Sequence, residues 1–327
     1  MPRHPRVWLL CLLLAAPWSA AQGPATASAD GLLQQMTHAL RTLDYQGSLV
    51  YEHDGRIDSL RLFHAGGEHE RERLVSLSGP TTEIVRDGGK VVCNLADGSS
   101  AHFTQSSTRG LLPLVPTASR RALSSHYAIS LAGTDRVAGH SADIVDVAAR
   151  DGYRYGYRLW LDRQTRLLLR SVVLDGKKRP LEQVMFVALE IGVPPDEIDL
   201  RLARAPAPAT RAAPVETESP SSTRWQVVDL PEGFRLVSTR QATINTDGAE
   251  HLVYSDGLAG VSVYIEPLTP QSGDSSALSM RGTLNIYTQA QGSWRVTAMG
   301  NVPALTVQQM AQSVTPLPAS DTAERVR

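Results

Sequence analysis

The sequence predicts a mainly β protein of two domains, a large antiparallel sheet with one packed helix followed by a smaller α+β module. Asp-Gly dipeptides recur between runs rich in β-branched and aromatic residues, amphipathic helical patterns are few, and one Pro- and Ala-rich segment divides the chain. A length of 327 residues accommodates two domains, since a domain usually takes about 100 to 200 residues.

The Asp-Gly dipeptides predict hairpin turns, because this pair suits the positive φ angles of tight turns. They stand at residues 54–55, 87–88, 97–98, 151–152, 175–176, 247–248 and 256–257. We expect one curved sheet of about ten strands in the first domain, a size at which sheets curl into open or closed barrels.

Helical patterns are limited to three places. Asp30 is a candidate N-cap for a helix with apolar residues at three- and four-residue spacing, and its apolar face should pack on the sheet. A short helix is expected over 119–127, and a terminal helix starts at Pro303.

The organisation along the chain follows from composition. A basic start, an apolar core from Val7 to Ala16 and the small residues 19–21 predict a secretory signal peptide over 1–21. The large domain is expected over 28–200 and the small one over 224–316. The Pro-rich segment 201–223 is expected to be a linker, and the polar tail 317–327 is expected to be disordered.

Charge and cysteine content narrow the function classes. Lys and Arg total 32 against 33 Asp and Glu, so no basic field for nucleic acid is expected. Removing the signal peptide deletes Cys11 and leaves Cys93 alone, which excludes an internal disulfide. Cys93 is interpreted as a small apolar group in a strand, with a reactive thiol as the alternative.

Sequence motifs of catalysis and cofactor binding are absent. The chain has no G-x-S-x-G, H-E-x-x-H, P-loop or G-x-G-x-x-G motif and no C-x-x-C pair. His64 and His69 flank a Gly-Gly turn, but we interpret them as solvated loop histidines because a zinc site needs three or four protein ligands. We therefore expect a protein that is not an enzyme and has no metal or cofactor.

The stretch from Gly152 to Gly176 is among the richest in aromatic and aliphatic side chains. Period-two alternation places Tyr153, Tyr155, Tyr157 and Leu159 on one strand face and Trp160 with the arginines on the other. We expect a hairpin that forms the wall of a lipid-sized hollow. Which of the two faces looks inward stays open.

A second candidate for lipid contact is the loop 109–121. Leu111, Leu112 and Leu114 are interrupted by prolines, so the loop cannot lie in a central strand, yet it is too apolar to remain in water. Two interpretations stay open: the loop caps the core, or it is a lid over a ligand cavity.

Arginines on the predicted strands are candidates for partner binding. Arg154 and Arg158 suit recognition of acidic peptides or phosphorylated lipid head groups. The plain alternative is that outward positions of an antiparallel sheet are simply polar. In the small domain we add Tyr254 and Tyr264, on two predicted strands, as partner-binding candidates.

Several stretches together resemble the RseB/MucB family of periplasmic regulators of the envelope-stress sigma factor. They are residues 39–55, 59–95, 152–171, 227–238 and 292–314, in the family's order along the chain, and the signal, linker and tail also correspond. No single motif is diagnostic, and the ordered set carries the resemblance.

The resemblance implies a large domain like the open β-barrels of LolA and LolB, with a separate α+β module. It implies a periplasmic protein without catalytic residues that binds the periplasmic part of an RseA/MucA-like transmembrane anti-sigma factor. Binding would shield that factor from the site-one protease, and lipopolysaccharide or mislocalised lipoprotein would release it.

Our hypothesis is a periplasmic sensor in which an acyl chain enters the curved sheet, while the anti-sigma segment contacts the small domain and the cleft between domains. Negative coupling follows if the two ligands favour different domain arrangements. The alternative function is a periplasmic lipid or lipoprotein carrier, with an enzyme as the third candidate. Self-association into a homo-oligomer remains possible on the sequence.

Overall fold

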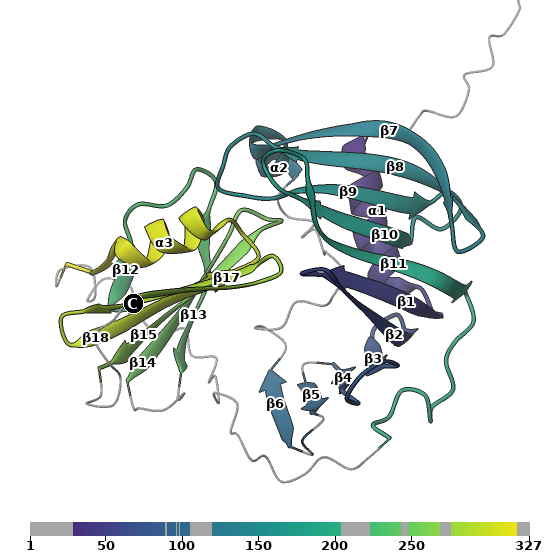
Figure 1. The fold of residues 1–327 in the computed structure, drawn as a ribbon, viewed down its shortest axis with the longest axis horizontal. Helices are drawn as coiled ribbons and strands as arrows, with labels where there is room; N and C mark the ends of the chain where they lie inside the picture. Colours follow the sequence, from purple (N-terminus) through teal and green to yellow (C-terminus); the bar gives the residue numbers. More distant parts are fainter. Residues whose placement is uncertain are drawn as a thin grey trace, which may run out of the picture.

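In the computed structural model, the described residues are 29–88, 90–95, 97, 99–104, 120–203, 223–242, 248–268 and 276–318. They form two domains that stand side by side in Figure 1. The expected signal peptide, the loop 109–119, most of the linker and nearly all of the tail lie outside the described residues. None of the helices in the described ranges combines the length and apolarity needed to cross a bilayer.

The large domain is built on an 11-stranded antiparallel sheet in the order β6-β5-β4-β3-β2-β1-β11-β10-β9-β8-β7. The elements are α1 (Ala29–Thr42), β1 (Tyr45–His53), β2 (Arg56–Ala65), β3 (Arg71–Ser76), β4 (Glu83–Asp87), β5 (Lys90–Asn94), β6 (Ser100–Thr104), α2 (Arg120–His126), β7 (Tyr127–Val137), β8 (His140–Ala149), β9 (Gly156–Asp162), β10 (Leu168–Leu174) and β11 (Pro180–Ile191). The terminal strands β6 and β7 are not paired with each other, so the sheet is open.

Tight turns join most neighbouring strands, as the Asp-Gly pattern predicts. Between β1 and β2 the turn residues Asp54 and Gly55 have φ angles of 49° and 70°, the backbone of a hairpin turn whose twist matches the flanking strands. The β9–β10 hairpin is also confirmed, with Leu168 opposite Leu161.

Helix α1 crosses the sheet and covers the face that we call the inner face (Figure 1). Leu33, Met36 and Leu40 of the helix share one apolar cluster with strand residues such as Leu159 and Phe186. Full burial of each such side chain stabilises the fold by about 1.5–3 kcal/mol. The helix already includes Ala29 and Asp30, so the expectation that Asp30 caps it was wrong.

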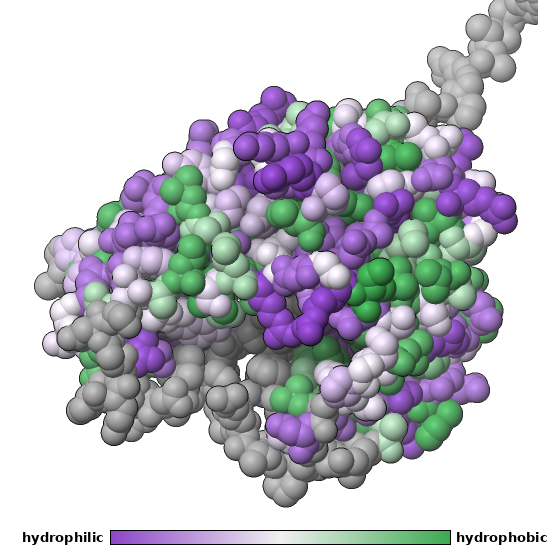
Figure 2. Space-filling model, viewed as in Figure 1, coloured by the Kyte–Doolittle hydropathy of each residue, from purple (hydrophilic) through white to green (hydrophobic). Residues whose placement is uncertain are grey.

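The opposite side, the outer face, has a smaller apolar cluster around Trp160, Leu169 and Val172. This face is turned to the viewer over β7–β11 in Figure 1. Figure 2 shows apolar side chains gathered over part of it beside polar ones. Both faces of the sheet therefore carry apolar side chains, as the composition of the β9–β10 stretch predicts.

The small domain contains a 6-stranded antiparallel sheet in the order β13-β14-β15-β18-β17-β16 and a 2-stranded pair, β12 with β19. Its elements are β12 (Trp225–Val227), β13 (Arg235–Ala242), β14 (Ala249–Ser255), β15 (Gly260–Pro267), β16 (Ala277–Arg281), β17 (Leu284–Gln291), β18 (Trp294–Gly300), α3 (Ala304–Gln312) and β19 (Val314–Pro316). Helix α3 begins directly after Pro303, as expected, and buries Val307 and Met310.

Two strands of the small domain were not predicted. Strand β16 is an edge strand with every residue exposed, and its sequence, ALSMR, lacks the β-branched residues that mark strands. Strand β19 has only three residues and pairs with β12 near the start of the domain.

Buried glutamates hold the described residues on both sides of segment 204–222. Glu83, on β4, accepts the backbone N–H of Ala203 at 3.0 Å and pairs with Arg73 at 2.6 Å. Glu250, on β14, accepts the Thr223 hydroxyl at 2.9 Å and the Arg224 guanidinium at 2.7 Å. The connection between the domains thus starts and ends at fixed points.

Candidate functional site at the junction of the two domains

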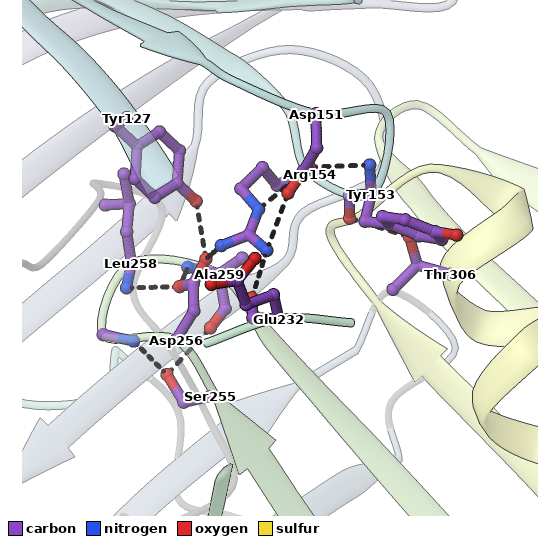
Figure 3. Close-up of polar contacts among 11 residues, drawn as sticks. Tyr127, Asp151, Tyr153, Arg154, Glu232, Ser255, Asp256, Leu258, Ala259 and Thr306 are labelled. Carbon is purple, nitrogen blue, oxygen red and sulfur yellow. Dashed lines mark hydrogen bonds and ion pairs between the residues drawn. The ribbon is translucent and has the colours of Figure 1, made fainter. Parts of the chain in front are cut away.

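The junction is centred on Arg154, which lies in the loop before β9. Its side chain has no exposed surface. Nη1 donates to Asp256 Oδ2 of the small domain at 2.7 Å, and Nη2 donates to the backbone carbonyl of Glu232, also in the small domain, at 2.6 Å. Nε donates to Asp151 of its own domain at 3.1 Å. Figure 3 shows the guanidinium between these groups.

Two aromatic rings flank the same guanidinium. Its central carbon lies 5.6 Å from the ring centre of Tyr127 and 5.2 Å from that of Phe234, within the range of a cation–π attraction. The Tyr127 hydroxyl also donates to Asp256 Oδ2, at 2.9 Å. Burial, with the adjacent Asp256 carboxylate, raises the pKa of Tyr127 well above its ordinary value.

Asp256 belongs to the turn between β14 and β15. Its side chain is fully buried, and its other oxygen, Oδ1, accepts the backbone N–H groups of Leu258 and Ala259 at 2.8 and 2.7 Å. One carboxylate therefore shapes its own turn and joins the two domains. The Asp-Gly signal predicted this turn but not its contact with the large domain.

Leu258, at the tip of the same turn, is 5% exposed and belongs to the apolar cluster of the large domain. That cluster also contains Tyr127, Val147, Tyr157 and the α1 leucines. A residue of the small domain thus completes the core of the large one. We call residues Asp256–Ala259 the tip and the large-domain groups that receive it the socket.

Further contacts surround the tip. The Thr306 hydroxyl of α3 donates to the Tyr153 carbonyl at 2.7 Å, and Asn285 donates to the Tyr155 hydroxyl at 3.1 Å. Gly233, with a φ of 86°, lies against His126, where any Cβ would collide with the imidazole ring. These contacts make the junction a closely packed interface.

A second contact lies at the rim of the junction, at the turn between β16 and β17. Asp54 accepts the Gly282 N–H at 2.8 Å, and Glu182 accepts the Thr283 N–H at 2.6 Å. The Asp54 side chain is 52% exposed. We call this the rim contact, to distinguish it from the buried tip.

The structure separates the predicted lipid-wall residues. Strand β9 starts at Gly156, so Tyr153 and Tyr155 precede it and are part of the junction; the expectation of three tyrosines on one strand face was wrong. The cause is Asp151, whose carboxylate binds the Tyr153 N–H at 2.9 Å and folds the chain into a turn. Tyr157 and Leu159 lie on the inner face.

Trp160 is on the outer face, where it lines a hollow of about 470 Å³ with residues that include Arg158, Arg170 and Val172. The Arg170 guanidinium stacks 4.2 Å from the centre of a Trp160 ring. On β9, Tyr157 and Leu159 therefore face α1, whereas Trp160 faces away from it. Leu111, Leu112 and Leu114 lie outside the described residues.

The predicted partner-binding residues occupy different environments. Arg158 forms a two-pronged contact with Asp146 at 2.6 and 2.8 Å and is 46% exposed. Tyr264 is half-buried and stacks on His251, with ring centres 4.1 Å apart. Tyr254 is buried, and its hydroxyl accepts the Val227 N–H at 3.1 Å. Contact between Arg154 or Tyr254 and another protein would require rearrangement.

Metal-binding and thiol chemistry receive no geometric support among the described residues. No group of three or more His, Cys, Asp or Glu side chains there is placed to hold a metal ion. His64 is buried on β2, where its Nδ1 donates to the Leu43 carbonyl at 2.9 Å and its Nε2 faces Glu70. The interpretation as a solvated loop histidine was therefore wrong. Partial burial raises the pKa of the Cys93 thiol, which disfavours the reactive thiolate.

Comparison with known proteins places both domains in one family. Residues 28–208 match the model of the MucB/RseB N-terminal domain, and residues 219–315 match that of the C-terminal domain. The sigma factor AlgU regulatory protein MucB of Pseudomonas aeruginosa is 31% identical, over 93% of this chain and 96% of its own. The sigma-E factor regulatory protein RseB of Escherichia coli is 29% identical, over 90% and 93%.

Solved structures agree with this assignment. MucB in the Pseudomonas aeruginosa MucA/MucB complex superposes with a TM-score of 0.69 at 31% identity, covering 89% of this chain and 99% of that one. MucB alone gives a TM-score of 0.65 at 32% identity, covering 90% and 100%. The two-domain fold is therefore shared with these proteins.

Proposed function

Because the chain belongs to the MucB/RseB family, we propose that it is a periplasmic regulatory protein that binds the periplasmic region of a membrane-anchored anti-sigma factor. The observation that carries the proposal is the match of both domains to MucB in its complex with MucA, over 89% of this chain. The named relatives regulate sigma factors, so the proposed role is binding rather than catalysis.

We further propose that the bound segment is shielded from the protease that would begin its degradation. Shielding requires only that the bound anti-sigma segment is kept out of the active site of the protease. A two-domain binding protein can do this without catalysing a reaction. The signal peptide expected over 1–21 would deliver the protein to the periplasm, where the partner segment lies.

Release by lipopolysaccharide or mislocalised lipoprotein is the third part of the proposal. An acyl chain requires apolar surroundings, and we propose that it enters the apolar cluster between α1 and the sheet, in which Tyr157 and Leu159 are buried. Leu111, Leu112 and Leu114 stay candidates for lipid contact on their apolar character alone. The ligand acts on the partner only through its different affinity for the two domain arrangements.

Isothermal titration of the full mature chain with the periplasmic segment of the anti-sigma factor from the same organism tests the proposed function. We expect saturable binding and slower cleavage of the segment by its site-one protease. A segment that gives no binding heat and is cleaved at an unchanged rate would contradict the proposal.

Arg158 provides a sharper version of this test, because it is the exposed member of the predicted partner-binding set. We expect Arg158→Ala to weaken binding of the segment about tenfold, a common loss for an arginine at the centre of an interface. Arg163→Ala is the matched control, since Arg163 is also exposed and pairs with an aspartate of β8. Equal affinities of the two variants would remove Arg158 from the interface.

A further inference from the structure

The outer face of the large domain has a hollow that the proposed function does not use. It has a volume of about 470 Å³ and is lined by residues of β1, β9, β10 and β11. Pockets that bind small ligands usually have volumes of about 300–1,000 Å³. The hollow lies on the opposite side of the sheet from α1 and from the apolar cluster that contains Tyr157 and Leu159. We call it the outer hollow.

Arg170, on β10, lines the outer hollow and is held in place from two sides. Its guanidinium stacks 4.2 Å from the centre of a Trp160 ring, and its Nε donates to Gln183 Oε1 at 3.0 Å. Trp160 is held in turn by a hydrogen bond from its Nε1 to Asp135, at 2.9 Å. These contacts fix the guanidinium before any ligand arrives, which is what a binding site requires of its polar groups.

The charge of Arg170 has no direct counter-charge. Within the described part of the chain, no carboxylate forms an ion pair with Arg170, and its side-chain hydrogen bonds go to the neutral amide of Gln183. Burial lowers the pKa of Arg170, and the nearby Arg158 cation acts in the same direction, against the raising effect of Asp135. Arg158, by contrast, already has its two-pronged contact with Asp146. The Arg170 fork is therefore available to a carboxylate, whose two oxygens match it.

The opposite side of the outer hollow carries the opposite charge. Glu52, on β1, is exposed, and its one hydrogen bond among the described side chains comes from Gln183 Nε2 at 3.5 Å. In the sheet Glu52 lies beside Gln183 of β11, which lies beside Val172 of β10. Two strand spacings, about 10 Å, therefore separate β1 from β10. Val172 and Leu174 add apolar lining between the two charges.

We propose that the outer hollow is a binding site for a short zwitterionic peptide, about three residues long, with a free amino end and a free carboxyl end. Arg170 binds the terminal carboxylate and Glu52 binds the terminal ammonium group. The side chains of the peptide pack against Val172 and Leu174. An extended chain advances about 3.4 Å per residue, so about three residues span the distance between the two charged ends.

The charges that line the outer hollow disfavour other classes of ligand. Glu52, Asp54 and Glu182 all line it, so a ligand with two negative charges would bring like charges together. An alkyl chain on an anionic head group would lie against the same carboxylates and remove them from water, which is costly. Lys178, in the turn between β10 and β11, is a further lining cation. It allows the peptide to carry one acidic side chain besides its terminal carboxylate.

The test titrates the full mature chain, without any anti-sigma segment, with tri-alanine by calorimetry. Two matched probes each lack one charge: tri-alanine amide has no carboxylate, and N-acetyl-tri-alanine has no ammonium group. We expect saturable binding of tri-alanine. Amidation should weaken binding about tenfold, because it removes a charge-assisted hydrogen bond to a fixed guanidinium. Acetylation should weaken it about threefold, because the ion pair with Glu52 is exposed to water.

Two variants assign the two ends of the peptide. Arg170→Gln should weaken tri-alanine binding about tenfold and leave the affinity for tri-alanine amide unchanged, because the amide has already lost the same interaction. Glu52→Gln should weaken tri-alanine binding about threefold and leave the affinity for N-acetyl-tri-alanine unchanged. Arg163→Gln is the matched control, since Arg163 is exposed, pairs with Asp143 and lies outside the outer hollow. It should change none of the three affinities.

Three results would each overturn the proposal: no saturable heat with tri-alanine at millimolar concentration, equal affinities for tri-alanine and its amide, or equal losses for all three peptides in both variants. The last result would mean that the substitutions act on the fold rather than on the ligand. Glu52→Gln changes an exposed side chain, so it keeps the test decisive even if Arg170→Gln does not fold. None of these results depends on the anti-sigma segment, so the proposed function is tested separately.

Discussion

Two of the contacts between the domains, the tip and the rim contact, use the same chemistry in different surroundings. At the tip, the Asp256 carboxylate is fully buried and accepts from Arg154 and Tyr127. At the rim, Asp54 accepts one backbone N–H while its side chain is half exposed. When the domains separate, water can replace the Asp54 acceptor at the rim. Separation at the tip instead exposes the Arg154 guanidinium and part of the apolar cluster that Leu258 covers. The buried contact should therefore determine the domain arrangement.

The largest effect is expected from removing Arg154. Arg154→Ala leaves the buried Asp256 carboxylate without its cation, and breaking a buried ion pair in this way costs about 3–5 kcal/mol. We expect the free energy of unfolding, measured by urea titration, to fall by that amount. Arg158→Ala, four residues on but exposed, should cost no more than about 1 kcal/mol. Equal losses in the two variants would contradict the difference drawn between the contacts.

Truncating the apolar part of the tip comes next. Leu258→Ala removes a side chain that is 5% exposed in the large-domain cluster, and such truncations cost about 2–5 kcal/mol. We expect a lower urea midpoint of unfolding. We also expect a larger distance between two spin labels attached to the cysteines of Ser141→Cys and Ser279→Cys, in a Cys93→Ser background. Leu278→Ala, at an exposed position, should change neither quantity. A label distance that stays fixed in Leu258→Ala would count against the tip.

Tyr127→Phe should have an intermediate effect and a distinct pH dependence. The lost hydrogen bond to a carboxylate is worth about 1.5–3 kcal/mol. The pKa of Tyr127 is raised in the folded state by burial and by Asp256, so its contribution is complete below about pH 10, the ordinary tyrosine value, and is lost as the pH rises above it. Urea titrations between about pH 8 and pH 11 should show a shallower alkaline loss in Tyr127→Phe. An identical slope in both proteins would rule out this contribution.

The smallest effect is expected at the rim. Asp54→Asn keeps an acceptor oxygen for the Gly282 N–H and removes only the charge, so the free energy of unfolding should change by less than about 1 kcal/mol. The label distance should not move. A loss at the rim as large as that from Arg154→Ala would mean that the exposed contact, not the buried one, holds the domains.

Much of the fold was predictable because its signals are local. The Asp-Gly turns, the period-two runs and the helix after Pro303 each depend on neighbouring residues. Strand β16 was missed because ALSMR has no β-branched residue, and its place at the edge follows from pairing with β17. Asp30 was misjudged as a cap because a helix can begin before the first good capping residue.

The candidate site was only partly predictable. Arg154 and the Asp256-Gly257 turn both stood out in the sequence, but they are 102 residues apart and no local pattern connects them. The local turn at Asp151 also overrode the alternation that put Tyr153 and Tyr155 on a strand. The family resemblance predicted the overall role, whereas the contact between tip and socket required three-dimensional structure.

The central claim, that ligand binding and partner binding oppose each other through the domain junction, has one direct test. The preformed complex of the full chain with its anti-sigma segment is titrated with lipid A, and release of a fluorescently labelled segment is followed by anisotropy. The account predicts complete, saturable release by lipid A in wild type. Retention of the segment at saturating lipid A would contradict it.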